Sequence, residues 1–241
     1  MEQSKDIKTI ILKTIVGSVA HGLSTPESDT DYRGVFVIPT SEMLKLGGHT
    51  EQTSWIEGKD DNTSWEIGHF LNMAVHCNPT VLETFLAPSA PSRFPENLND
   101  QIDLENEKKL AQELRDLFPY VWNANDVKNA FIGYGVNQRK KFFDNKDNRA
   151  PKYAAAYARV LYNARELLET GTFTIRIADT EIGTTIRKFK DGEYTPGEVI
   201  QVCWDLETKV LQAFKSGKYK NKETDVRPVN DFLLRVRREF W

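Results

Sequence analysis

The sequence has few cysteines and no long hydrophobic run. Cys77 and Cys203 are its two cysteines, and they form neither a CxxC motif nor a spacing typical of metal ligands. No apolar stretch approaches the roughly 20 residues of a membrane-spanning helix, and the first residues are too polar and acidic for a signal peptide. We therefore expect a protein of a reducing, cytoplasmic setting that has no membrane partner.

The sequence also lacks a strong net charge of either sign. Its 32 basic and 35 acidic residues leave a formal net charge of −3, so any contact with nucleic acid must come from a local basic patch. The GxSxG, HD and HExxH motifs of common hydrolases are absent from it. With 241 residues, of which 39% are hydrophobic and 28% charged, the chain can form one large globular domain or two modest ones.

What the sequence does contain is a glycine-serine turn followed closely by two aspartates. An apolar segment ends at Val16 and leads into Gly17-Ser18, and Asp29 and Asp31 begin a second apolar strand. Alternation along a strand sends both carboxylates to the same face, where they repel each other unless a divalent cation lies between them. Ligands that are all oxygen suit Mg²⁺ or Mn²⁺.

The same turn offers a phosphate its backbone N–H groups and the Ser18 hydroxyl, and Ser28 adds a hydroxyl beside the acids. Together with a divalent ion, this combination predicts phosphoryl or nucleotidyl transfer. Such chemistry needs a third carboxylate from a neighbouring strand. Asp61, at the start of a predicted strand, is our first candidate and Glu66 is the second, although Asp60-Asp61-Asn62 is equally typical of a solvated turn.

Patterns along the chain predict a mixed first half and a helical second half. Pro88, Pro91 and Pro95 mark a connector at about 88–98, so we expect one domain at 1–90 and another at 98–241. The predicted strands are 14–16, 32–38, the segment after the turn at 47–54, the segment after Asp61 and 173–177. The predicted helices are 66–75, 81–86 with Thr80 or the Asn78 amide as its cap, 103–117, 124–143, 151–170 with Gly171 as its C-cap, 180–188 and 197–214.

The helix predicted from Pro151 places Lys152, Arg159 and Glu166 seven residues apart on one face. One interpretation is that Lys152 and Arg159 bind a triphosphate. The other is a solvated face with an Arg159–Glu166 ion pair. His21, beside the glycine-serine turn, is a candidate donor to the triphosphate or a hydrogen-bonding surface residue.

The residues also resemble a known family. Gly17-Ser18 with Asp29-x-Asp31 is similar to the signature of the nucleotidyltransferase superfamily that includes DNA polymerase beta. The longer segments 17–22, 28–37 and 78–83 resemble its bacterial and phage branch associated with RNA repair and RNA ligases, and the segment 152–171 is similar to that branch's helical part. In that branch a strand that carries an acid leads into a helix that ends in Asn-Pro-x-x-x-Glu. Asp61 precedes Trp65-Glu66 at the matching spacing, so the resemblance implies that Asp61 is the third ligand. One departure is His21, where relatives often have tyrosine.

The resemblance implies an α+β fold: a polymerase-beta-like mixed sheet with flanking helices, followed by a mainly helical C-terminal domain that closes over the nucleotide. It implies transfer of a nucleoside monophosphate, with Mg²⁺ or Mn²⁺, from a nucleoside triphosphate to a hydroxyl of an RNA end, a protein or a small molecule, with release of pyrophosphate. The alternatives are a catalytically silent nucleotide-binding module and a toxin–antitoxin-type modifying enzyme.

Overall fold

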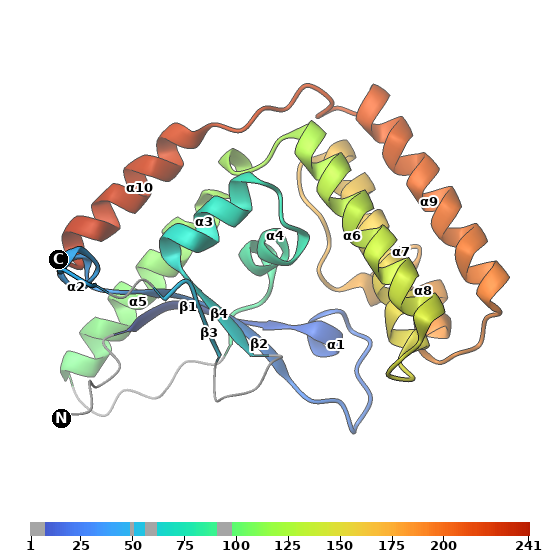
Figure 1. Cartoon of the computed structure of the whole chain (residues 1–241), viewed down its shortest axis with the longest axis horizontal. Coiled ribbons are helices and arrows are strands. Elements are labelled where there is room, and N and C mark those ends of the chain that lie inside the picture. Colours follow the sequence, from blue (N-terminus) through green and yellow to red (C-terminus); the bar gives the residue numbers. More distant parts are fainter. Residues whose placement is uncertain (1–7, 49–50, 56–61, 91–97) are drawn as a thin grey trace.

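A small mixed sheet lies on the left of the view in Figure 1 with several helices around it, and the helices of residues 124–216 form a group on the right. This computed structural model describes residues 8–48, 51–55, 62–90 and 98–241. The strands are β1 (Thr9–Val16), β2 (Asp31–Val37), β3 (Thr53–Trp55) and β4 (Thr63–Glu66). The helices are α1 (Gly17–Ala20), α2 (Thr40–Leu44), α3 (Ile67–Val75), α4 (Pro79–Leu86), α5 (Leu98–Asp116), α6 (Ala124–Asp144), α7 (Ala150–Thr170), α8 (Gly183–Lys190), α9 (Pro196–Ser216) and α10 (Val226–Glu239). The predicted α+β class is confirmed.

The four strands follow the order β1-β2-β4-β3. β1 pairs antiparallel with β2, β2 pairs parallel with β4, and β4 pairs antiparallel with β3. In the first pair Val16 lies opposite Asp31, so the chain leaves β1 for α1 beside the point where it enters β2. This register places the glycine-serine turn next to the second aspartate.

One hydrophobic core connects the sheet with the helices that follow it. Val35 and Val37 of β2 belong to the same buried cluster as Phe70 of α3, Phe85 of α4 and Leu161 of α7. α6 and α7 lie along each other, and α7 also packs against α8 and α9. This packing brings the helices of the second half up to the end of the sheet at which β1 leads into α1 and β2 begins (Figure 1).

Most of the predicted elements are confirmed, and two details are wrong. Of the two predicted caps, Asn78 and not Thr80 caps α4, because its side-chain oxygen accepts hydrogen bonds from the Thr80 and Val81 N–H groups. Residues 173–177 form no strand, and Ile177 instead begins a short 3₁₀ turn. The basic C-terminal segment, for which no helix was predicted, forms α10 with Asp225 as its N-cap.

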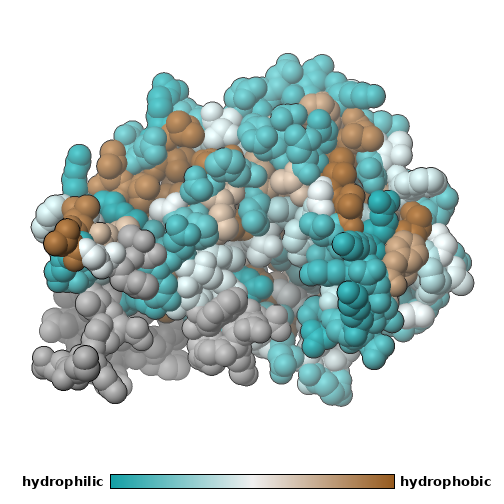
Figure 2. All heavy atoms as spheres, in the orientation of Figure 1, coloured by the Kyte–Doolittle hydropathy of each residue, from teal (hydrophilic) through white to brown (hydrophobic). Residues whose placement is uncertain are grey.

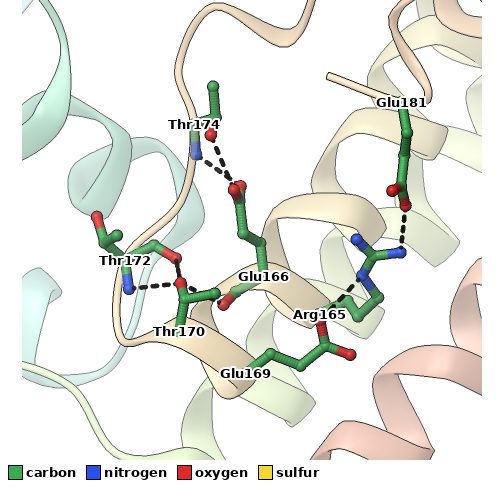
Figure 3. A network of polar contacts seen from close by, with 7 residues as sticks. All are labelled: Arg165, Glu166, Glu169, Thr170, Thr172, Thr174 and Glu181. Carbon is green, nitrogen blue, oxygen red and sulfur yellow. Dashed lines mark hydrogen bonds and ion pairs between the residues drawn. The ribbon is translucent and has the colours of Figure 1, made fainter. Parts of the chain in front are cut away.

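The loop at 172–174 is fixed by the end of α7 and not by strand pairing (Figure 3). Glu166 accepts hydrogen bonds from the Thr174 backbone N–H and hydroxyl, at 2.7 and 2.8 Å. The Thr170 hydroxyl donates to the Thr172 carbonyl at 2.9 Å. Glu166 therefore does not form the predicted ion pair with Arg159.

None of the helices in the described part of the chain is long and apolar enough to span a membrane.

Candidate active site

A cavity of about 660 Å³ opens where the sheet edge meets α4, α6, α7 and α8. The eight predicted site residues that lie in the described ranges all line it. They are Gly17, Ser18, His21, Ser28, Asp29, Asp31, Lys152 and Arg159. Residues from α1, β2 and α7 thus meet around one cavity, although Gly17 and Arg159 lie 142 positions apart in the sequence.

The acidic wall of the cavity contains the two aspartates and the glycine-serine turn. Asp31 opens β2, and Asp29 lies in the exposed loop just before it. Gly17 has a φ of +67°, and a Cβ built on it would lie 2.1 Å from Asp31 Oδ2. The carboxylate of Asp31 therefore occupies the space that only glycine leaves beside the turn. Ser28 holds the loop in place, because its hydroxyl oxygen accepts a hydrogen bond from the Thr25 N–H at 2.8 Å.

This close approach predicts the effect of a single methyl group. Gly17→Ala should displace the Asp31 carboxylate and lower both stability and nucleotidyl transfer. Gly47 is a matched control, because it also has a positive φ (+73°) but a Cβ on it meets nothing within 4 Å. Both alanine variants should lose about 1 kcal/mol from the left-handed backbone, and only Gly17→Ala should lose activity. Thermal unfolding and transfer assays of both variants test this, and equal activity of the two would contradict it.

The third predicted carboxylate, Asp61, lies outside the described residues. The second candidate, Glu66, is placed elsewhere. Its Oε1 lies 2.7 Å from Arg237 Nη2 of α10, and its Oε2 accepts from the Gly68 N–H at the start of α3. Glu66 does not line the cavity, so it is not the third ligand of a metal held there.

The opposite wall of the cavity is cationic. Lys141 of α6, Lys152 and Arg159 of α7, Lys190 of α8 and Arg149 just before α7 all line it. Hydrophilic residues gather over the C-terminal end of α6, the part of the helix that carries Lys141 (Figure 2). Because the acids and these cations face the same space, the cavity can hold both a divalent cation and a polyanion.

Two cations of α8 also fix the loop after α1. Arg187 Nη2 donates to the Gly22 carbonyl at 2.5 Å, and Lys190 Nζ donates to the Leu23 carbonyl. Partial burial lowers the pKa of Lys190, and the neighbouring charge of Arg187 lowers it further. These contacts tie the turn at the sheet edge to the helical half of the molecule.

A buried network joins the two walls. Glu83 of α4 accepts a hydrogen bond from His21 Nε2 at 2.5 Å and another from Arg159 Nη1 at 3.1 Å. Burial alone would raise the pKa of Glu83, but the charges of Arg159 and His21 and their hydrogen bonds outweigh it and lower that pKa to about 2. Burial and the Arg159 charge lower the pKa of His21. Glu83 is therefore ionised and His21 neutral at pH 7.

This network corrects the predicted roles of two residues. His21 uses its Nε2 on Glu83, so only its other ring nitrogen is left for a ligand of the cavity that it lines. Arg159 uses one nitrogen on Glu83 and still lines the cavity. Glu83, the last residue of the segment 78–83, is the group that holds both. The Asn-Pro-x-x-x-Glu segment was the available signal for it.

Within the described ranges, no three His, Cys, Asp or Glu side chains are grouped closely enough to hold a metal ion by themselves. Asp29 and Asp31 supply two carboxylates to one cavity, and bound phosphate oxygens are the usual further ligands of Mg²⁺. The donor set therefore suits a hard divalent cation that binds together with a phosphate.

Comparison with known proteins agrees with this chemistry. The chain is 30% identical over 144 residues to an uncharacterized 38.9 kDa protein from the nrdC-mobD intergenic region of Enterobacteria phage T4. The match covers 56% of this chain and 39% of the phage protein. No solved structure matches the chain significantly. The model of one family, described as "RlaP: RNA repair pathway DNA polymerase beta family", matches residues 1–187, and the chain belongs to this polymerase-beta-type nucleotidyltransferase family.

Proposed function

We propose that this protein transfers a nucleoside monophosphate from a nucleoside triphosphate to a hydroxyl at an RNA end, with pyrophosphate as the leaving group. The observation that carries this proposal is the cavity in which Asp29 and Asp31 face Lys152 and Arg159. A triphosphate with a divalent ion needs both walls. RNA is the acceptor class that agrees with the RNA repair context of the family.

Asp29 and Asp31 would hold Mg²⁺ or Mn²⁺, and we propose Asp61 as the third carboxylate. The position of Asp31 supports its own part in this site. Its carboxylate lies directly against Gly17, in the turn that would bind the phosphate. A divalent ion held there would neutralise charge on the triphosphate and would make the acceptor hydroxyl easier to deprotonate.

The protein groups bind and orient the triphosphate. Lys152 and Arg159 bind its phosphate oxygens. The first backbone N–H groups of α1 and the Ser18 hydroxyl are further donors to the phosphate, because the first N–H groups of a helix have no partner within it. His21 and Glu83 position Arg159. The acceptor oxygen bonds to the α-phosphorus as the bond to the bridging oxygen breaks, pyrophosphate leaves, and the hydroxyl proton goes to solvent. In this proposal the region 1–90 supplies the acids and 98–241 supplies most of the cations.

A screen with α-labelled triphosphates tests the proposal. Each of the four triphosphates is incubated with Mg²⁺ or Mn²⁺ and with RNA that carries free hydroxyl ends. The expected result is labelled RNA together with an equal amount of pyrophosphate, and chelation of the metal should stop both. Release of inorganic phosphate in place of pyrophosphate, or labelling of protein with no labelling of RNA, would contradict it.

A further inference from the structure

The cavity also has neutral polar residues beside its cations. Its neutral polar members on the helical side are Thr80 at the start of α4, Tyr134 and Gln138 of α6 and Tyr153 of α7. Tyr134, Gln138 and Lys141 follow each other at helical spacing, so they share one face of α6. This face of α6 therefore offers a ring and an amide next to one cation.

Gln138 is unusual among these groups. Its exposed fraction is 6%, and yet no described residue forms a hydrogen bond with its side-chain amide. The side-chain atoms of Gln138 are not among the fully buried polar atoms that lack a partner, so the amide is open to the cavity that Gln138 lines. An amide that has no protein partner and opens into a cavity can form its hydrogen bonds with what binds there.

We propose that the Gln138 side chain binds the edge of the nucleobase of the bound triphosphate and so helps to choose the base. The inference rests on the proposed function. An amide presents one acceptor and two donors, which matches the adjacent donors and acceptors of a base edge. A phosphate only accepts hydrogen bonds, and the cationic wall already meets that need. Tyr134, one turn away, provides a ring on which a base can stack.

The substitution Gln138→Glu gives a sharp test, because it replaces an amide with an acceptor of the same shape. The Watson–Crick edge of guanine presents two neighbouring donors, whereas that of adenine presents one donor and one acceptor. A carboxylate accepts from both guanine donors and meets a lone pair on adenine. The ratio of GTP to ATP affinity should therefore rise about tenfold or more relative to the wild type.

Two further variants complete the design. Gln138→Met keeps the length of the side chain and removes the hydrogen bonds, so it should reduce the differences among the four triphosphates. It also keeps the test valid if the glutamate variant does not fold. Asn137→Asp is the matched control, because it adds the same charge one residue earlier at an exposed position that does not line this cavity. It should leave the GTP to ATP ratio unchanged.

Dissociation constants of the four triphosphates in the presence of Ca²⁺ give the readout, since binding is then measured without depending on turnover. A Gln138→Glu protein that binds all four more weakly by one common factor would overturn the inference and leave the proposed function intact. Unchanged differences among the four dissociation constants in Gln138→Met would also overturn it. If the wild-type chain binds none of the four, the proposed function itself fails, and this inference fails with it.

Discussion

Replacing Asp29 or Asp31 with asparagine should abolish nucleotidyl transfer and leave the chain folded. Each substitution removes one of the two carboxylates that face the cationic wall, and with it the charge that would hold a divalent ion against the triphosphate. The loss of one such electrostatic contact to a reacting group lowers kcat by about 10² to 10³, and the loss of the ion itself should lower it further. Labelled nucleotide transfer at saturating triphosphate measures the effect.

Stability should change little in these variants. Asp29 is exposed, and replacing either aspartate relieves the repulsion between two like charges. Asp205→Asn is a suitable control, because Asp205 is an exposed residue of α9 that does not line the cavity. If the Asp29 and Asp31 variants kept activity within tenfold of the Asp205 variant, the two aspartates would not be metal ligands.

The second large effect concerns stability, and it follows from the burial of Glu83. Glu83→Gln should lower the free energy of unfolding by about 3 kcal/mol or more, because it leaves Arg159 without its partner in a buried place. Glu181→Gln is the matched control. Glu181 also pairs with an arginine, Arg165 at 2.7 Å, but its side chain is 65% exposed, so its loss should cost under about 1 kcal/mol.

Denaturant unfolding at several pH values tests this further. The pKa of Glu83 is lowered from 4.5 to about 2 in the folded chain. Its stabilising effect is therefore complete above pH 4.5 and is lost as the pH falls toward 2. The difference in stability between the wild type and Glu83→Gln should be largest near neutral pH and should shrink across this range. A constant difference, or equal losses in the Glu83 and Glu181 variants, would contradict the buried ion pair.

The sequence predicts one wall of the cavity better than the others. Gly17, Asp29 and Asp31 lie within 15 positions of each other, so the pairing of two neighbouring strands is enough to place them together, although Asp29 lies in the loop before β2 and not in the strand as predicted. Glu83 and Gln138 lie on separate helices, and they face the same space only because α4 and α6 pack against one core. No spacing within either helix shows which face will meet the cavity.

The errors in secondary structure have similar physical causes. Residues 173–177 are β-branched and apolar enough for a strand, but Thr174 is bound to Glu166. α10 did have a local signal, because Asp225 caps it and Val229, Phe232 and Val236 are its buried side chains at helical spacing. Its buried face is explained by contacts with α3, distant in sequence.

The most direct test of the account is a crystal structure of this chain with Mn²⁺ and a non-hydrolysable nucleoside triphosphate. We predict an anomalous difference peak coordinated by carboxylate oxygens of both Asp29 and Asp31, at about 2.2 Å, with the triphosphate between the Gly17 turn and the side chains of Lys152 and Arg159. A triphosphate bound elsewhere, or two carboxylates that point apart with no manganese between them, would contradict the account.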